Sequence, residues 1–399
     1  MLSLTTTEQQ FTALLRAAVS GGEAVCENAD WEALFALAGQ QKLLPIFFEY
    51  VRKTPAAAEN EVLFASVRQQ VLAQVLSQTL REAEFSALYA SLREAGLHPL
   101  LVKGQLCSRL YPLRGHRISA DDDLLIPDDE LLRCHEALVQ SGLETPCPAD
   151  ELAQADEIPY RKGDSALYIE LHRRLFDSSA AAPDDLNRFF CGVAPVETDG
   201  FLTLPPHEHL LYLILHAYKH FVGSGVGLRQ LCDIGLWARA YHGEISWPLL
   251  HGQCAAVHAE RFAAAAFAAA RDTLGIAFSL PAPWDDAPEV EPLLHDALCG
   301  GVYGSSSAAR LHSATVTKNA VKASRGGKRG SALAALFPSR RYMQRQYPYV
   351  KRSALLLPAA WTQRAVRYLF QRRSAPALSE PLQLAKERIE LLKLYGVLE

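Results

Sequence analysis

The run Arg117-Ile-Ser-Ala-Asp-Asp-Asp-Leu-Leu-Ile126 places three consecutive aspartates before a short apolar segment. We expect Asp123–Pro127 to form a buried strand, because a short apolar run between polar residues is typical of one. Side chains at positions i and i+2 of a strand point to the same face, so Asp121 and Asp123 should share a face. Two carboxylates this close repel each other unless a cation lies between them, and Mg²⁺ prefers oxygen ligands of this kind.

An α+β segment surrounds the aspartates. The expected elements are, in chain order, a strand at His98–Lys103, a helix at Gln105–Tyr111, the strand above, a helix at Asp128–Ser141, and a β-hairpin with strands at Ile158–Lys162 and Ala166–Leu175. Asp128 is the expected N-cap of its helix, and Gly142 is the expected terminator. The residues Gly163-Asp164 form the turn of the hairpin.

Glu170 lies in the middle of the second hairpin strand, between Ile169 and Leu171. An acid inside an apolar strand costs free energy unless it is paired or bound to a metal. Carboxylates from two neighbouring strands can hold two metal ions, which clamp the attacking and leaving oxygens of a phosphoryl displacement. The alternative is that the aspartates form a loop acid cluster and that Glu170 is an ion-pair partner.

Helical sequence flanks this segment on both sides. The expected helices are Thr7–Val19 with Thr6 or Thr7 as N-cap, Trp31–Ala38, Leu43–Arg52, Glu61–Ala95, His207–Phe221, Leu228–Tyr241, Trp247–Leu274, Ala359–Arg372 and Leu382–Tyr395. The predicted organisation is therefore an N-terminal helical region at 1–95, a core at 96–204 and a C-terminal helical region at 205–399.

The overall composition is that of an ordinary globular protein, with 49% hydrophobic and 21% charged residues among 399. We expect no membrane span, because no apolar run approaches the ~20 residues that one needs. No N-terminal segment has the pattern of a signal peptide. The eight cysteines are scattered without a CxxC pair, a spacing that fits neither a zinc site nor a disulfide framework. These features predict a cytoplasmic location.

The net charge of −4 hides a strong asymmetry. No acid occurs from Ala297 to Ser379, and fifteen Lys and Arg lie between Arg310 and Arg373, so the rest of the chain carries −19. We expect this segment to face the cleft or the acidic N-terminal region, as a surface for phosphates, nucleic acid or an acidic partner. A solvated or interdomain face is the alternative.

Aromatic residues interleave with this basic sequence, a pattern that can bind nucleic acid but that tertiary packing also produces. The aromatic residues are Tyr342, Tyr347, Tyr349 and Trp361, and the basic ones are Arg341, Arg345, Lys351 and Arg352. The overall acidity of the chain argues against a general nucleic-acid binder.

Several motifs, taken in order, resemble a bacterial family of uncharacterised nucleotidyltransferases. They are Leu101-Val-Lys-Gly104, Leu110-Tyr111, the run at 117–126, Ile169-Glu-Leu-His-Arg173, the segment from His209 to His220, Leu336-Phe-Pro-Ser339, Tyr347-Pro348 and Leu355-Leu-Leu-Pro358. The wider superfamily is similar to DNA polymerase β in its catalytic core. The resemblance implies an α+β fold, with a polymerase β-like core of a mixed sheet and flanking helices between two helical regions.

The resemblance also implies roles for individual residues. Asp121, Asp123 and Glu170 become the catalytic carboxylates and the ligands of Mg²⁺ or Mn²⁺. The residues expected to contact the nucleotide are Lys103, Gly104, Arg117 and His172. The superfamily places a Gly-Ser or Gly-Gly pair after the first strand, whereas this chain has Gly104-Gln105. Lys103 or Arg117 would then supply charge in place of the hydroxyl, unless each forms a structural ion pair.

The predicted reaction moves a nucleoside monophosphate from a nucleoside triphosphate, with ATP as the favoured donor, to a hydroxyl-bearing acceptor that is a small molecule, peptide or protein. The alternatives are an RNA- or tRNA-directed transferase, and a catalytically silent nucleotide-binding protein of the same fold. Asp122, where the family tends to have an apolar residue, is expected either to be exposed at the strand entrance or to compete for metal.

Two pairs of residues on the C-terminal helices have i,i+4 spacing and so share a helix face. His216 and His220 are either packing residues or part of the acceptor pocket. Arg229 and Asp233 are expected to form a helix pair rather than to bind substrate.

Overall fold

The computed structural model describes residues 4–24, 26–177, 183–301, 347–351, 353–371 and 379–398, with single residues between 310 and 343. The chain forms two compact units, one made of residues 1–221 and 225–306, the other of 222–224 and 307–399. The division of the chain at 95 and 204 remains a prediction.

The first unit contains a four-stranded sheet with the strand order β1-β2-β4-β3. The strands are β1 (Leu100–Val102), β2 (Asp122–Leu125), β3 (Glu157–Arg161) and β4 (Tyr168–His172). The β2 strand pairs antiparallel with β1 and parallel with β4, and β3 and β4 form the antiparallel hairpin. This mixed sheet with its flanking helices confirms the predicted α+β fold. A second sheet pairs β5 (Val196–Thr198) with β6 (Phe201–Thr203).

Among the helix starts that differ from the prediction, two are explained by side-chain bonds. The helix α7 begins at Leu131, because the Asp128 carboxylate bonds to Arg173 Nε at 2.9 Å instead of capping a helix. The helix α1 is capped by Thr5, one residue earlier than expected, in a capping box in which Thr5 and Glu8 bond to each other's backbone N–H.

The N-terminal helices follow the predicted pattern. They are α1 (Thr6–Ser20), α2 (Trp31–Gln40), α3 (Leu44–Val51), the short α4 (Ala56–Glu59) and α5 (Glu61–Glu94). The 34-residue α5 buries Phe64, Val67 and Val71 in its first half and Phe85, Leu88 and Leu92 in its second. Between these two apolar stretches it also buries Arg81, which becomes important for the site.

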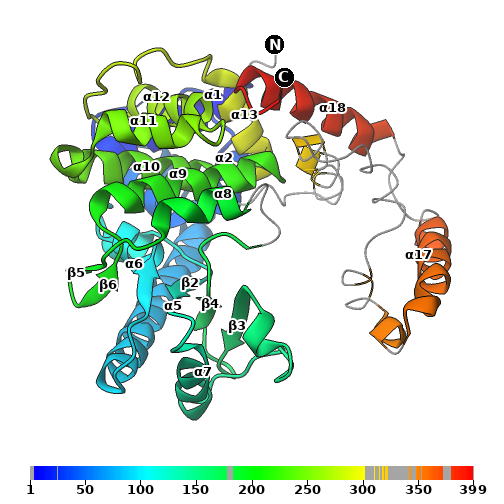
Figure 1. Ribbon diagram of the computed structural model, residues 1–399. Coiled ribbons are helices and arrows are strands. Elements are labelled where there is room, and N and C mark those ends of the chain that lie inside the picture. The colour runs from blue at the N-terminus through cyan, green and yellow to red at the C-terminus, as the bar shows by residue number, and fades with distance from the viewer. Residues whose placement is uncertain are drawn as a thin grey trace. The chain divides into compact units, whose positions relative to one another are not determined.

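A second helical layer follows the sheets, and Figure 1 shows α9 to α12 stacked together. The helices that follow the sheets are α9 (Pro206–Val222), α10 (Leu228–Ala240), α11 (Trp247–Ala255), α12 (Glu260–Ala268) and α13 (Glu291–Gly300). Three shorter helices lie between strands in the sequence: α6 (Gly104–Ser108), α7 (Leu131–Gln140) and α8 (Pro183–Asn187). Among the described residues, no helix is long and apolar enough to cross a membrane.

The predicted single helix Trp247–Leu274 is wrong, because the chain turns between α11 and α12. His258 adopts a left-handed conformation with φ 57°, and the Ala259 N–H bonds to the Cys254 carbonyl at 2.9 Å. The α12 helix then ends in a π-helical turn at Ala269–Thr273. Apolar residues at helical spacing on both sides of the turn gave the pattern of one continuous helix.

The helix α10 is buried on every side from Leu228 to Ala238. Gly235 permits this packing, since a Cβ there would lie only 2.5 Å from the Ala270 Cβ. The absence of a side chain at Gly235 thus lets α10 lie directly against the alanine-rich α12 segment.

In the second unit, the structure describes α17 (Leu357–Gln371) and α18 (Ser379–Leu394). Tyr347 is buried with Met343, Val350 and Ala360, and Tyr349 and Trp361 pack against this cluster. Tyr347, Tyr349 and Trp361 therefore take part in tertiary packing, which was one of the two interpretations of the aromatic residues within the basic sequence. Tyr342 and the basic residues Arg341, Arg345 and Arg352 lie outside the described residues, so the predicted placement of the basic segment stays a prediction.

Candidate active site

The candidate site lies where β2 and β4 run side by side in parallel. The pairing register sets Asp123 directly opposite Glu170, and Val102 of β1 lies opposite Asp123 on the other side. His172 follows two residues after Glu170 and so points to the same face of β4. One ligand atom from each of Asp123, Glu170 and His172 lies within 4.8 Å of the other two. The sheet thus brings together two predicted metal ligands and one predicted nucleotide contact.

The Asp123 carboxylate, only 2% exposed, lies between two cationic groups. Lys103 Nζ lies 2.6 Å from Asp123 Oδ2, and His172 Nε2 lies 3.0 Å from Asp123 Oδ1. Burial alone would raise the pKa of Asp123, but Lys103 and His172 outweigh burial and hold that pKa well below its ordinary value. Asp123 is therefore an anion whose charge is balanced from both sides.

The same arrangement shifts the pKa of His172 in the opposite direction. Burial would lower the pKa of its imidazole, but hydrogen bonds to Asp123 and Glu170 raise that pKa to about 9. Its Nε2 also lies 3.7 Å from Glu170 Oε2. As the chain stands, His172 is an imidazolium that bridges the two carboxylates.

Asp121 lies beside this cluster rather than within it. It precedes β2 and lines a recess together with Lys103, Gly104 and His216. Asp121 is half-buried. The predicted triad is therefore assembled in part, with Asp123 and Glu170 in direct register and Asp121 at the mouth of the adjoining recess.

Asp122 follows neither of the two expectations for it. It is 2% exposed and makes a 2.6 Å ion pair with Arg81 of α5. Strand alternation directs it away from Asp123, so it is neither at an exposed strand entrance nor among the candidate metal ligands. Burial raises the pKa of Asp122 to about 6 although Arg81 opposes the shift. An arginine of α5 thus compensates an acid in a position where the resemblance predicted an apolar residue.

The turn between β1 and α6 places Lys103 over Asp123. Lys103 and Gly104 both adopt left-handed conformations, with φ 61° and 48°. A Cβ on Gly104 would lie 2.9 Å from Asp122 Oδ1, so the packing of Asp122 requires glycine here. Gln105 bonds to the Glu82 carbonyl of α5 at 3.4 Å and so does not replace the missing serine.

His209 holds the backbone of this turn, a role that sequence reasoning missed. The Lys103 N–H donates to His209 Nε2 at 3.2 Å, while His209 Nδ1 lies 3.2 Å from Thr203 Oγ1. The Thr203 hydroxyl in turn donates to the Leu101 carbonyl at 2.8 Å. Burial lowers the pKa of His209 to about 3, so the ring is neutral and can accept the Lys103 N–H. The only sequence signal was that His209 begins one of the resemblance motifs.

Arg117 is placed in a buried ion pair, which was the alternative to its predicted nucleotide contact. Its Nε and Nη2 bond to both carboxylate oxygens of Asp233 at 2.8 and 2.6 Å. Its Nη1 donates to the Gly104 carbonyl at 3.2 Å. Tyr111 also donates to Asp233, at 2.8 Å. Asp233 of α10 thus binds both Tyr111 and Arg117. Arg117 in turn holds the backbone of the turn at Gly104 through its bond to the Gly104 carbonyl.

His216 of α9 also lines the recess. Its Nε2 lies 3.2 Å from Lys103 Nζ, and its ring packs edge-on against His220 with centroids 4.7 Å apart. Burial, with Lys103 second, holds the pKa of His216 well below its ordinary value. A neutral His216 accepts from the Lys103 ammonium, so it orients that ammonium between itself and Asp123.

The donor set at this site suits a hard divalent cation. Two carboxylates, Asp123 and Glu170, face one another, and Asp121 adds a third within the adjoining recess. Lys103 and His172 now balance the charge of Asp123, so a metal ion bound there would compete with these two cations. Carboxylate oxygens are the ligands that Mg²⁺ and Mn²⁺ prefer.

A family described as uncharacterised nucleotidyltransferase matches residues 27–275 of the chain. The match includes the long helix α5, both sheets and the helices α9 to α12. No curated protein and no solved structure matches the chain.

Proposed function

Because the chain belongs to the family of uncharacterised nucleotidyltransferases, we propose that it transfers a nucleoside monophosphate from a nucleoside triphosphate, with ATP as the favoured donor. The acceptor we propose is a hydroxyl group on a small molecule, a peptide or a protein. Transfer of a nucleotidyl group in general follows from the family. The donor, the acceptor and the dependence on metal are the proposal.

The observation that carries this proposal is the register of β2 and β4, which sets Asp123 opposite Glu170 at the edge of a recess lined by Lys103 and Asp121. Two carboxylates in this relation would hold Mg²⁺ or Mn²⁺, with Asp121 as the third ligand. Bound there, the metal would neutralise charge on the transferred phosphoryl group and align the two reacting oxygens.

Lys103 supplies the exchangeable charge of the proposed mechanism. It is 13% exposed at its side chain, and its ammonium lies between Asp123 and His216. With a cation at Asp123, this ammonium is released from its 2.6 Å contact and can bind a phosphate oxygen instead. The α6 helix has five residues and so contributes little dipole, which leaves the lysine side chain as the main phosphate contact.

Glu170 and His172 are the groups that could take up the acceptor proton. Glu170 is partly exposed, and its Oε2 lies 3.7 Å from His172 Nε2. Because His172 is held as an imidazolium by the two carboxylates, it must lose its proton before it can accept one. We therefore assign proton uptake to Glu170 and orientation of Asp123 to His172.

The test is to incubate the purified full chain with Mg²⁺, a cell extract and each of labelled ATP, GTP, CTP and UTP. We expect label to pass to an acceptor in the extract, most strongly from ATP. Asp123→Asn should lower this transfer by more than ~100-fold, since loss of even an outer-shell partner of a metal costs 10–100-fold.

Asp164→Asn is the matched control, because Asp164 is exposed in the turn between β3 and β4. It should transfer label as the unchanged chain does. Transfer that survives Asp123→Asn would refute the assignment of the site. Binding of Mg²⁺ and ATP without any transfer would support the catalytically silent alternative instead.

A further inference from the structure

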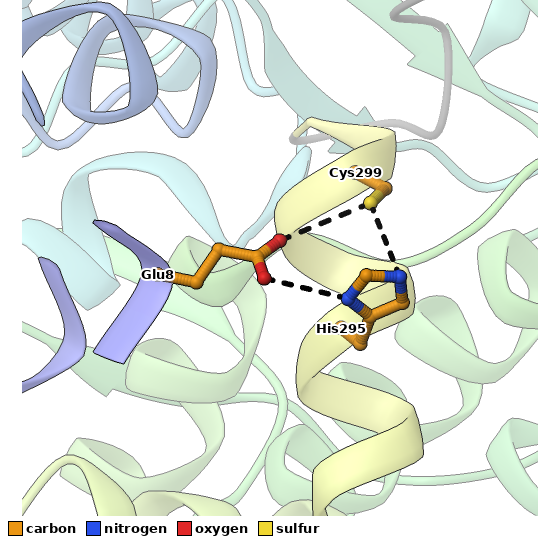
Figure 2. Close-up of side chains that lie close together, drawn as sticks. All are labelled: Glu8, His295 and Cys299. Carbon is orange, nitrogen blue, oxygen red and sulfur yellow. Dashed lines mark hydrogen bonds and ion pairs between the residues drawn. The ribbon is translucent and has the colours of Figure 1, made fainter. Parts of the chain in front are cut away.

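A second group of potential metal ligands lies between the first and the last helix of the first unit. Figure 2 shows Glu8 of α1 and His295 and Cys299 of α13 with their side chains directed toward one another. Cys299 Sγ lies 3.6 Å from His295 Nε2 and 3.9 Å from Glu8 Oε1. One ligand atom from each residue lies within 4.8 Å of the other two. The contact joins residues separated by more than two thirds of the chain.

Helix geometry accounts for two of the three positions. His295 and Cys299 are four residues apart on α13 and therefore lie on the same helix face, one turn apart. The end of α13 is fixed from outside, because Gln41 Nε2 donates to the Ala297 carbonyl at 2.9 Å. The backbone that carries the imidazole and the thiol is thus held in place by a neighbouring element.

The capping box of α1 orients the third residue. Glu8 Oε2 accepts from the Thr5 N–H at 2.8 Å and from the Thr5 hydroxyl at 3.0 Å. This leaves Oε1 as the oxygen directed at Cys299. Glu8 is also 7% exposed, so its carboxylate is both oriented and mostly withdrawn from water. The cap therefore positions a ligand oxygen without any help from a metal.

From this geometry we infer that Glu8, His295 and Cys299 form a binding site for Zn²⁺ or a similar transition metal, separate from the site at Asp123. A sulfur, a nitrogen and an oxygen donor are the set that Zn²⁺ accepts and that Mg²⁺ avoids. Tetrahedral coordination with typical zinc bond lengths gives edges of about 3.3–3.6 Å between ligand atoms. The Sγ–Nε2 separation already matches, whereas the Glu8 carboxylate, now 3.5 Å from His295 Nδ1 and 3.9 Å from the sulfur, would have to move toward the Nε2 side of the ring.

The arrangement also assigns the two nitrogens of His295. Nε2 faces the thiol and is the ligand, while Nδ1 lies 3.5 Å from Glu8 Oε2. Three protein ligands leave a fourth position for water, on the side where Cys299 is exposed. A metal bound here would link the start of α1 to the end of α13.

The experiment uses Co²⁺ as a spectroscopic substitute for Zn²⁺ on the full chain, in excess Mg²⁺ to occupy the carboxylate site. A thiolate bound to Co²⁺ gives a near-ultraviolet charge-transfer band, which Asp123 and Glu170 cannot produce. We expect one equivalent of Co²⁺ to generate the band and added Zn²⁺ to remove it. The band should be absent in Cys299→Ser and unchanged in Cys191→Ser, the matched exposed cysteine.

Two further variants test the other ligands. Glu8→Gln keeps the capping box, which accepts Glu or Gln at this position, but removes the carboxylate charge. Glu8→Gln and His295→Gln should each weaken Co²⁺ binding by at least tenfold, and circular dichroism should confirm that both fold. No band in the unchanged chain, a band that survives Cys299→Ser, or full affinity in both glutamine variants would overturn the inference.

Discussion

Asp122 and Asp123 are adjacent in the sequence and equally buried at 2% exposure, yet the structure pairs them in opposite ways. Asp122 faces Arg81, a buried arginine of α5 that also donates to the Ser119 carbonyl at 2.6 Å. Asp123 faces Lys103, which lines the recess, and His172, which lies beside the Glu170 carboxylate. One aspartate has a fixed cation and the other has exchangeable ones.

The difference follows from the chemistry of the two cations. The guanidinium of Arg81 is a planar fork, and two acceptors, Asp122 and the Ser119 carbonyl, hold it in place. Lys103 carries a compact charge on a flexible stem, and His172 can lose its proton. We therefore expect Asp122 to contribute to folding and Asp123 to binding, although nothing in the tripeptide distinguishes them.

Arg81→Met should have the largest effect on stability. It leaves the Asp122 carboxylate buried without its cation, which typically costs ~3–5 kcal/mol of the free energy of unfolding. Urea denaturation of Arg81→Met should show this loss, whereas Arg68→Met, at an exposed position of the same helix, should change little. The double variant Arg81→Met/Asp122→Leu should recover most of the loss. Equal stability of Arg81→Met and Arg68→Met would remove the distinction between the two aspartates.

Lys103→Met should strengthen metal binding at Asp123 while weakening nucleotide binding. The change removes a competing cation, and hydrogen bonds to charged groups contribute ~1.5–3 kcal/mol, so Mn²⁺ affinity should rise about tenfold or more. Mn²⁺ titration followed by electron paramagnetic resonance measures this affinity directly. Lys162→Met is the control, since Lys162 pairs with Glu84 at an exposed position. An unchanged or lower Mn²⁺ affinity would mean that Lys103 does not exchange with metal.

His209→Asn should change how stability depends on pH. The pKa of His209 is about 3 in the folded chain, below the ordinary value of 6.5, so the unfolded chain binds a proton first as the pH falls. The neutral histidine therefore contributes its full stabilisation above pH ~6.5. Below that pH, its contribution to the free energy of unfolding falls by up to ~1.4 kcal/mol per pH unit. Between pH 6 and pH 4, the stability difference between the unchanged chain and His209→Asn should shrink at that rate.

The control for this prediction is His258→Asn, because His258 is exposed and asparagine tolerates its left-handed conformation. Its stability difference from the unchanged chain should stay nearly constant over the same pH range. A constant difference for His209→Asn as well would mean that the ring already takes up a proton in the folded chain, and the neutral acceptor for Lys103 would be lost.

The structure also changes the expected consequence of removing Asp123. Repulsion between neighbouring carboxylates, taken alone, predicts that Asp123→Asn keeps or raises thermal stability without metal. Because Lys103 and His172 both contact Asp123, the variant instead leaves two buried cations with a weaker partner. We now expect a modest loss of stability alongside the loss of transfer, measurable by thermal unfolding in the presence of a chelator.

The sequence alone determined the four strands of the larger sheet, their order along the chain and the faces of Asp123 and Glu170, because alternation and turn chemistry are local properties. It did not reveal the short hairpin of β5 and β6. It also determined the family, through motifs that occur in a fixed order. It could not choose the partner of Asp122, since Arg81 lies 41 residues away on a helix whose apolar pattern is interrupted there. The same limit hid the roles of His209 and Asp233 and the approach of Glu8 to His295 and Cys299, because each of these contacts joins elements that are distant in the sequence. Only tertiary packing decides which cation a buried carboxylate meets, because the free energy of a buried charge depends on groups brought to it from elsewhere in the chain.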